Sequence, residues 1–523
     1  MTNRKHNKLL LLTASTLAFA LTACGNPVSS QVSSKSEEEI VSSSMEAKSE
    51  EIPTNEATSE AVSEEEEVSS MISSEEEIIP KEYAYEAKGN FSYVPTFVGW
   101  QTESFTYKDS YFYRSGKKDN PGLLDMSICL CLSASEPGGS TNVEGLLTQA
   151  GFTGIEAYDM AGKPTEDTIG CAFGYRAIDD YNLIAISVRG EHYEKEWANN
   201  FTIGEEGNAL GFDTASEKVA NRLKAYIESH DLKKNKIWAS GYSRAGAVVD
   251  LLGAKINESK EDYFVTEDDI YVYAFEPATA YAGEKTYDNI HDVINPNDPI
   301  PYFAPREWGF KNAGKLVQLG EPGKIQTYQN LLNPEPYDEA DIPTFLEGTM
   351  SLITEKTTRE KYAKKVQSAL STLIALFMSK SMSQLTDMVE FVSSSASKAM
   401  EDPDTKRELT MAVYSAMAVE SDSNYKNLAN KLIGIVDNAL EDPEVIGLTE
   451  EEYASIKTNL YPVIRFFGPV VVSDYNPYKE EGKLNSYFFA TIFKNARSLI
   501  DPHCSNVSFA LVREGNFTFN PDK

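Results

Sequence analysis

The chain has 523 residues and a formal net charge of −32, from 80 acidic and 48 basic side chains. A protein this acidic is repelled by nucleic acid and by anionic surfaces, so we exclude both as partners. Its length leaves room for one large α/β domain together with further elements.

The N-terminal segment has the features of an export signal. Arg4, Lys5 and Lys8 form a positive region, and the apolar run at 9–20 is too short to span a bilayer as a stable anchor. The sequence LTACG closes the segment and resembles a bacterial lipobox, in which the cysteine becomes the lipidated first residue. We therefore expect Cys24 to carry a lipid anchor that holds the protein on the outer side of the cell membrane. The alternative is an ordinary signal peptide with an unrelated cysteine.

The next segment, residues 24–82, is mainly Ser, Glu and Val. Fifteen glutamates lie between Glu37 and Glu77, against the two lysines Lys35 and Lys48. Such a segment cannot bury enough apolar surface to offset its chain entropy, and its charges repel one another. We predict a disordered tether that holds a folded domain away from the membrane.

Short apolar runs alternate with helical periodicity between residues 127 and 295. The run NLIAISV at 182–188 is continuous, as in a strand that is buried on both faces, and DIYVYAF at 269–275 has the same character. Strands that alternate with helices predict the α/β class, with a mainly parallel sheet and helices on both faces. The expected elements are strands at 182–188, 236–239, 269–275 and 291–295 and a helix at 215–230.

A serine stands between the strand at 236–239 and an apolar helical segment, in the string GYSRAG. This layout is typical of a nucleophile elbow, whose sharp turn needs small residues two places before and after the serine. Gly241 and Ala245 meet that need. The turn would expose the hydroxyl of Ser243 and place the backbone N–H of Arg244 at a helix N-terminus, where it could stabilise an oxyanion. The string alone is often a chance loop, and its flanking elements favour the catalytic interpretation.

An acid and a base follow the serine in the order that such hydrolases use. Asp298 follows a buried strand and opens the proline-held loop NPNDPIP, and of five histidines only His503 comes after it. We predict that His503 accepts the proton of Ser243 and that Asp298 holds the imidazole in the correct tautomer. For each residue alone, the alternative is a turn aspartate or a surface histidine.

Helical periodicity dominates residues 343–465, and strand-like sequence returns only at 508–512. We predict an all-helical insertion that interrupts the sheet. Its apolar stripes at 371–378 and 385–391 could face lipid, as in a lid or cap over Ser243, or could form the insertion's own core, which is the commoner case. Helices are expected at 364–377, 383–392, 406–417, 424–440 and 450–460.

Four cysteines follow the tether, namely Cys129, Cys131, Cys171 and Cys504, and they show no metal-binding spacing. Cys129 and Cys131 are too close to pair with each other, and an exported location permits a disulfide without requiring one. We expect no metal, no other cofactor and a monomeric protein.

Taken in order, several blocks resemble the class 3 (fungal-type) lipase family of the α/β-hydrolase superfamily. The order of these weak motifs is more specific than any one of them, and the match covers residues 123–310 and 495–512. The resemblance implies a lipase-like α/β-hydrolase fold, a catalytic triad of Ser243, Asp298 and His503, and an oxyanion hole from the backbone N–H groups of Arg244 and Glu191. The blocks are IAISVRG with Trp197 soon after it, Gly211-Phe212 before a helix, GYSRAGA, YAFEPA, NPNDPIP and the late His503.

Three features depart from the family pattern. The family usually has Thr or Ser after Arg-Gly, whereas this chain has Glu191, whose carboxylate would oppose an oxyanion unless it points away. The block FEPA lacks the usual glycine. The interval between Asp298 and His503 is longer than usual because of the predicted helical insertion.

Two functions from different classes follow from these patterns. The first is a serine carboxylic ester hydrolase, tethered to the cell surface, that acts on lipid or acyl-ester substrates through an acyl-enzyme. The second is a catalytically inactive lipase fold that serves as a surface binding lipoprotein. Substrate and chain length stay open. The expected parts are a signal peptide at 1–23, a tether at 24–82, an α/β-hydrolase domain at 83–342 and 466–523, and a helical insertion at 343–465.

Overall fold

The structure is a computed structural model, and all of its described residues belong to one compact unit. The predicted signal peptide, Cys24 and the tether lie outside them. The described residues are 85–95, 99–161, 165, 168–191, 194–298, 300–302, 304–322, 354, 357–378, 398, 401–419, 421–439, 447–474 and 501–521.

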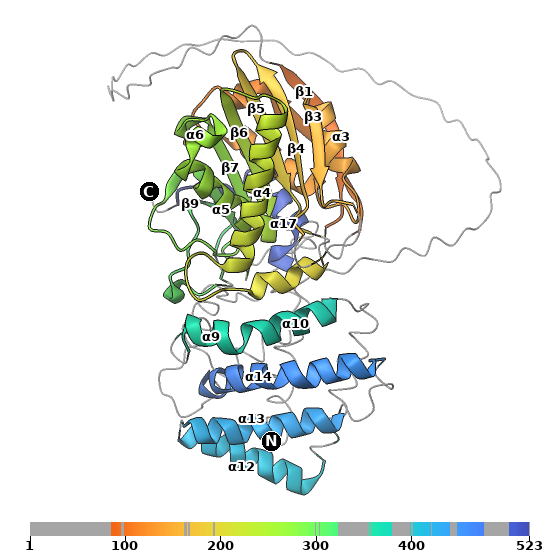
Figure 1. Ribbon diagram of the computed structural model, residues 1–523, viewed down its shortest axis with the longest axis vertical. Helices are drawn as coiled ribbons and strands as arrows, with labels where there is room; N and C mark the ends of the chain where they lie inside the picture. Colours follow the sequence, from red (N-terminus) through yellow and green to blue (C-terminus); the bar gives the residue numbers. More distant parts are fainter. Residues whose placement is uncertain are drawn as a thin grey trace, which may run out of the picture. The chain divides into compact units, whose positions relative to one another are not determined.

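A mixed eight-stranded sheet forms the centre of the described part, with the spatial order β10-β9-β8-β7-β6-β5-β4-β3 (Figure 1). The five strands from β5 to β9 run parallel, and β3, β4 and β10 pair antiparallel at the two edges. The alternating pattern of the sequence predicts this α/β class, and the mixed sheet with its helices fits an α/β hydrolase. The strands are β3 (Thr153–Tyr158), β4 (Cys171–Ile178), β5 (Tyr181–Val188), β6 (Asn235–Tyr242), β7 (Ile270–Phe275), β8 (Tyr287–Ile294), β9 (Gly314–Leu319) and β10 (Phe517–Phe519).

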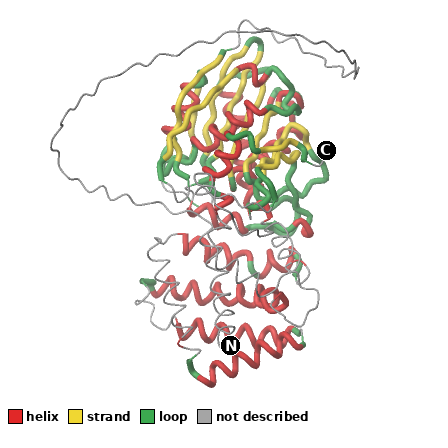
Figure 2. The backbone as a smooth tube through the Cα atoms, turned by 180° about the vertical axis from the view of Figure 1, so that it is seen from behind, coloured by secondary structure: helices red, strands yellow, loops and turns green. Residues whose placement is uncertain are grey.

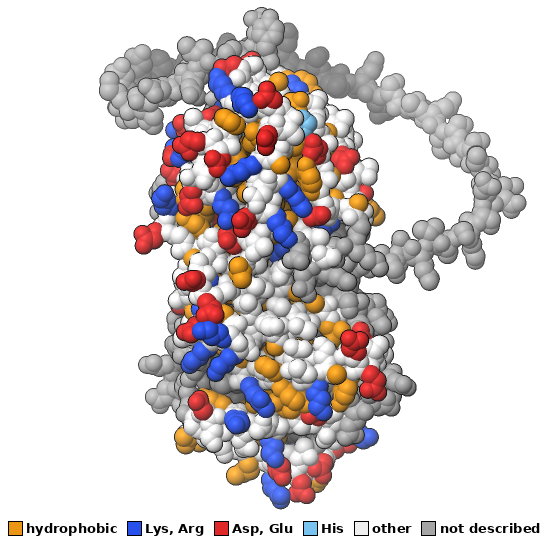
Figure 3. Space-filling view, viewed as in Figure 1, with side chains coloured by type: hydrophobic (Ala, Val, Ile, Leu, Met, Phe, Trp, Pro, Cys, Tyr) orange, Lys and Arg blue, Asp and Glu red, His pale blue; other side chains and the backbone are white. Residues whose placement is uncertain are grey.

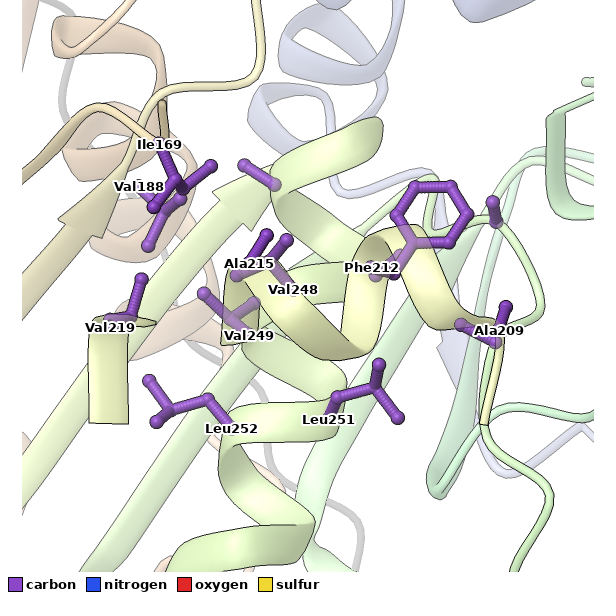
Figure 4. Packing of buried hydrophobic residues seen from close by; sticks show 14 of the residues in the cluster. Ile169, Val188, Ala209, Phe212, Ala215, Val219, Val248, Val249, Leu251 and Leu252 are labelled. Carbon is purple, nitrogen blue, oxygen red and sulfur yellow. The ribbon is translucent and has the colours of Figure 1, made fainter. Parts of the chain in front are cut away.

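Side chains of the sheet alternate between two hydrophobic cores. Ile184 and Ile186 of β5 face the core that includes α4 (Leu210–Ser229) and α5 (Arg244–Glu258). Figure 4 shows part of that core, with Ala215 and Val219 of α4 beside Val248 and Val249 of α5. Since successive side chains of a strand point to opposite faces, a strand between two cores is apolar throughout.

The opposite face of the sheet is covered by α2 (Pro121–Ser133), α3 (Thr141–Gln149) and α17 (Ser505–Arg513). A separate antiparallel hairpin, β1 (Glu86–Tyr93) with β2 (Gln101–Lys108), packs against this layer. These helices and the hairpin bury the second face of the sheet. The sheet therefore lies between two packed layers.

The segment 508–512 is helical, so the strand predicted there is wrong. It lies within α17, whose first turn follows Cys504, and Val507, Phe509 and Leu511 are all buried. The helix is covered on several sides, because α2 lies on one side and the ring of Phe91 from β1 meets Phe509 on another. A short helix buried in this way has the same unbroken apolar run as a buried strand.

Five helices are described between residues 357 and 474 (Figures 1 and 2). Residues Leu370, Leu373 and Ile374 of the predicted helix at 364–377 belong to the core that also holds α4 and α5. The described part of the first apolar stripe is therefore core, and the second stripe at 385–391 lies outside the described residues. The helices are α9 (Arg359–Lys365), α10 (Gln367–Met378), α12 (Pro403–Ala418), α13 (Asp422–Ala439) and α14 (Glu450–Asp474).

Arg359 attaches the first of these helices to the loop that precedes α4. Its guanidinium donates hydrogen bonds of 2.8–3.0 Å to the backbone carbonyls of four residues and lies 4.4 Å from the ring centroid of Phe310. The planar guanidinium thus holds four backbone carbonyls of one loop, which the single ammonium group of a lysine could not do. The four carbonyls belong to Ile203, Gly204, Glu206 and Gly207.

Figure 3 shows acidic and basic side chains interspersed over one face of the molecule. Ion pairs of the described residues include Lys255 with Asp213, which joins α5 to α4, and Lys364 with Glu205. Within the described part of the chain, no helix combines the length and the apolar character needed to cross a bilayer.

Candidate active site

Ser243 occupies the sharp turn between β6 and α5, with φ 58° and ψ −120°. This left-handed conformation is strained for a residue other than glycine and is typical of functional turns. The turn requires close backbone approach, because a Cβ on Gly241 would lie 2.3 Å from the carbonyl oxygen of Ala245. A Cβ on Gly246 would lie 2.6 Å from the carbonyl oxygen of Phe275 in β7. The small residues therefore let α5 begin directly over the sheet.

His503 lies between Ser243 and Asp298 and contacts both. Its Nε2 is 2.8 Å from Ser243 Oγ, and its Nδ1 is 2.6 Å from Asp298 Oδ2. The three side chains come from the turn after β6, the loop after β8 and the short helix η7 (Asp501–His503). The structure thus brings together all three residues that the sequence singles out, in the geometry of a nucleophile, a base and an orienting acid.

The three side chains differ in their access to solvent. Asp298 is fully buried, and its Oδ1 accepts a 2.8 Å hydrogen bond from the backbone N–H of Ile300. Ser243 retains 5 % of its exposure, and the side chain of His503 retains 12 %. The hydroxyl and the imidazole therefore keep a small area of contact with solvent, whereas the carboxylate has none.

The loop after β5 lies against the elbow. A Cβ on Gly190 would lie 2.0 Å from the carbonyl oxygen of Tyr242, so only glycine permits this approach. The loop therefore brings the backbone of Glu191 next to the turn that carries Ser243. Together with the start of α5 at Arg244, it forms the side of the site where the sequence predicts the oxyanion hole.

The side chain of Glu191 is directed to α17. Both of its carboxylate oxygens accept from the hydroxyl of Ser505, at 3.0 and 3.2 Å. Ser505 is the first residue of α17, and a carboxylate is stabilised at a helix N-terminus. The carboxylate therefore has a partner of its own, which removes the main objection to an oxyanion hole at this position.

A buried charged cluster supports the same loop. Arg189 donates to Glu196 Oε1 at 2.8 Å, and Nε of Arg244 lies 3.8 Å from the other oxygen of Glu196. Burial raises the pKa of the Glu196 carboxyl, and the two arginines oppose that shift. One carboxylate thus joins the residue before Gly190 to the residue after Ser243. Glu196 could not be predicted from the sequence, because nothing in the local pattern around it indicates two arginine partners.

A second carboxyl group lies beside Asp298. Glu276 follows β7, has a left-handed φ of 46° and is fully buried. Its carboxyl lies near that of Asp298, whose charge helps to raise the pKa of Glu276. The sequence analysis noted only the missing glycine in this block. An acidic residue directly after an unbroken apolar strand was the available signal.

The four described cysteines Cys129, Cys131, Cys171 and Cys504 are buried and free. Among the described residues, no group of three or more His, Cys, Asp or Glu side chains is placed to hold a metal ion.

Comparisons with known proteins yield structural likenesses. No family model and no curated protein matches the chain. One similar solved structure is a triacylglycerol lipase whose catalytic centre is a serine protease triad, with 16% identity, 38% of this chain and 79% of that chain covered, and a TM-score of 0.31. Lipase II from Rhizopus niveus has 12% identity, coverage of 38% and 78%, and a TM-score of 0.29. A mutant of MDLA from Penicillium cyclopium has 12% identity, coverage of 39% and 78%, and a TM-score of 0.27.

Proposed function

We propose that this protein is a serine carboxylic ester hydrolase, lipase-like in mechanism, that cleaves lipid or other acyl-ester substrates at the cell surface. The observation that carries the proposal is the hydrogen-bonded chain from Ser243 through His503 to Asp298 on a strained turn. A strained non-glycine residue persists only when the surrounding structure enforces it, and active sites are where such strain gathers.

The first half-reaction forms an acyl-enzyme. The Ser243 hydroxyl gives its proton to Nε2 of His503 and attacks the ester carbonyl carbon. Asp298 accepts from Nδ1–H and stabilises the imidazolium that forms. The negative charge that develops on the carbonyl oxygen is placed toward the N-terminus of α5 and the loop of Gly190, where the backbone N–H groups of Arg244 and Glu191 would donate to it. His503 then returns the proton to the departing alkoxide.

The second half-reaction regenerates the enzyme. Water replaces the alcohol, His503 accepts one of its protons, and the hydroxide attacks the acyl carbon. The tetrahedral adduct collapses, Ser243 leaves with the proton from His503, and the carboxylic acid is released. The hydrogen bonds that join Ser243 to His503 and His503 to Asp298 support this sequence of proton transfers.

The test is the substitution Ser243→Ala in the purified protein. We expect the turnover of p-nitrophenyl butyrate to fall by about 10⁴- to 10⁶-fold, as loss of a triad nucleophile does, with the thermal unfolding temperature nearly unchanged. A fluorophosphonate probe should label the wild-type protein and fail to label the variant. Ser259→Ala, at the opposite end of α5, is the matched control and should keep both turnover and labelling.

The opposite outcome would support the alternative function. A wild-type protein that folds but neither hydrolyses esters nor reacts with the fluorophosphonate would leave the alternative of a lipase-fold surface binding lipoprotein.

A further inference from the structure

We propose that Glu276 acts as a protonated carboxylic acid that donates a hydrogen bond to Asp298 and so positions the acid of the triad. The inference rests on the proposed function, because it assigns a positioning role within the same site. Glu276 touches neither the substrate nor the reacting atoms, and it acts only through Asp298.

The backbone fixes Glu276 beneath the loop that carries Asp298. Its N–H donates to the carbonyl oxygen of Val293 in β8 at 2.8 Å, and its φ of 46° turns the chain sharply after β7. Its Oε2 accepts a 2.9 Å hydrogen bond from the N–H of Asn295, the first residue of the loop. The side chain therefore lies along the loop 295–298 at the carboxyl ends of β7 and β8.

The partners of the two carboxyl groups decide where the proton resides. Asp298 accepts from Nδ1 of His503 and from the N–H of Ile300, and the first of these requires a carboxylate. Glu276 accepts from the N–H of Asn295 and, through Oε1, from the hydroxyl of Ser508 at 2.8 Å. None of its described hydrogen-bond partners is a cation.

Glu276 and Asp298 are both fully buried, and both hydrogen bond with the backbone of Asn295. Two neighbouring buried carboxyl groups cannot both be charged without a large energetic cost. One of them must carry a proton, and that proton can then form the hydrogen bond between them. Asp298 faces the imidazole that becomes positively charged, so the proton belongs on Glu276. Burial raises the pKa of Glu276 well above its usual range, and the charge of Asp298 raises it further.

The same network reaches the backbone of His503. The hydroxyl of Ser508 lies 3.3 Å from that of Tyr242, which donates to the carbonyl oxygen of His503 at 2.8 Å. Glu276 thus connects the loop that carries Asp298 with the segment that carries His503. The titratable side chains that face this region are Asp298 from the loop after β8, His503 from η7, Tyr242 from β6 and Glu191 from the loop after β5.

A protonated Glu276 has two effects on the triad. It fixes the direction of the Asp298 carboxylate, and it withdraws part of the negative charge from the oxygen that faces His503. Without this donor, more charge would remain on that oxygen, and the charged imidazolium would be favoured. The pKa that governs the rising limb of the pH–rate profile would then move to higher pH.

The experiment compares two replacements of nearly equal size in the full-length protein. Glu276→Gln keeps a donor for Asp298 and an acceptor for Asn295, whereas Glu276→Leu removes both. With p-nitrophenyl butyrate, we expect Glu276→Gln to stay within about twofold of wild-type kcat, with an unchanged pH profile. We expect Glu276→Leu to lose about 10- to 100-fold in kcat at similar KM, because the acid is no longer held in place. The rising limb of the pH–rate profile of Glu276→Leu should move to higher pH by about half a unit or more.

Several outcomes would overturn the proposal. Equal activity and equal pH profiles of the Leu variant and the wild type would show that Asp298 needs no support from Glu276. A Gln variant as impaired as the Leu variant would show that a charged Glu276 is required. Glu276→Met serves as a second apolar replacement. If neither apolar variant folded, Glu276 would be a structural residue and the proposal would fall.

The failure of this inference can be distinguished from failure of the proposed function. If Ser243→Ala kept esterase activity, the proposed function would be wrong whatever Glu276 does. If Ser243 proved essential while Glu276→Leu behaved as wild type, only the inference would be wrong.

Discussion

The environments of His503 and His291 suit these two histidines to different roles. His503 keeps partial access to solvent and has a carboxylate on one ring nitrogen and a hydroxyl on the other. His291 is fully buried in β8, stacks on Tyr273 with the ring centroids 4.5 Å apart, and its Nε2 hydrogen bonds with the carbonyl oxygen of Gly116. Burial lowers the pKa of His291 to about 4, so this imidazole stays neutral and holds the sheet to the loop at Gly116.

This contrast predicts which histidine is essential. His503→Ala should reduce kcat by about 10⁴-fold or more, and Asp298→Asn by about 10⁴-fold through the wrong tautomer. Ser243→Ala combined with His503→Ala should cost little beyond Ser243→Ala alone, because the residues act as a unit. His291→Phe, which keeps the ring stack, is the control and should remain within about twofold of wild type. Steady-state kinetics with p-nitrophenyl butyrate measures all four variants, and the reverse pattern for the two histidines would refute the assignment.

The candidate site was only partly predictable from the sequence. Ser243 was identifiable because an elbow has a local spacing, and Asp298 and His503 because they follow it in a fixed order at element ends. Glu276 offered only its position directly after an apolar strand, and Glu196 offered no signal. Their roles arise from contacts between segments far apart in the chain, such as Ser508 with Glu276 and Arg189 with Arg244 through Glu196. Tertiary contacts of this kind leave no local pattern.

At the scale of the element, strands that are buried on both faces were easier to predict from the sequence than partly exposed ones. The strands β5 and β7 were predicted to within one residue, because both are apolar throughout. The strands β1, β2 and β3 are partly exposed and were not predicted, because they lack the unbroken apolar runs that marked β5 and β7. The helix α17 shows the opposite limit, since seven of its nine residues are buried and its short apolar run cannot be told from a buried strand by sequence alone.

Helix α5 is joined to β8 and β9 by a buried pair of carboxyl groups, Asp250 and Asp292. Both oxygens of Asp250 lie 3.1 Å from the backbone N of Ala313, and Asp292 accepts from the N–H of Gly314 at 2.8 Å. Burial raises the pKa of both, that of Asp250 to about 7, and the charge of Asp250 raises that of Asp292 further. The folded protein therefore retains a proton that the unfolded chain releases above about pH 4.

The sign of the pH dependence follows from that proton. A raised pKa in the folded state stabilises it at low pH, and this contribution is lost as the pH rises from about 4 to about 7. Asp250→Asn cannot titrate, and its amide can still donate to Asp292 and accept from Ala313. We therefore expect the free energy of unfolding of Asp250→Asn, relative to wild type, to increase between about pH 4 and pH 7 and to level off above. Urea unfolding at several pH values measures this difference, in which the contribution of His291 cancels. A difference that is constant with pH would mean that the pair shares no proton.

At the scale of the whole molecule, α9, α10 and α14 extend the core of the α/β part, whereas α12 and α13 form a hydrophobic cluster of their own. Tyr362 of α9 donates to the carbonyl oxygen of Phe201, and Gln367 of α10 accepts from the N–H of Gly204. Together with Arg359, these contacts fix the loop between η2 (Glu194–Phe201) and α4. Helices α9 and α10 therefore buttress the segment that contains Glu196, whose carboxylate joins Arg189 to Arg244 beside Ser243.

The sequence predicts that this catalytic body acts at a membrane to which Cys24 anchors it. A flexible tether of the length of residues 24–82 has a root-mean-square span of about 40–45 Å, and its repelling glutamates extend it further. The domain could therefore reach substrates well beyond the lipid headgroups. We expect Cys24→Ala to move the protein from the membrane fraction to the soluble exported fraction, because the acyl chains supply the binding energy.

Fractionation of cells, with esterase activity measured in each fraction, tests the anchor. Turnover per molecule should be unchanged in Cys24→Ala, because Cys24 is far in sequence from Ser243, Asp298 and His503. Cys171→Ala, which alters a buried cysteine of β4, is the matched control and should stay with the membrane. If Cys24→Ala also stayed with the membrane, some other part of the chain would hold it there. The tether would then act only as a spacer for an anchor located elsewhere.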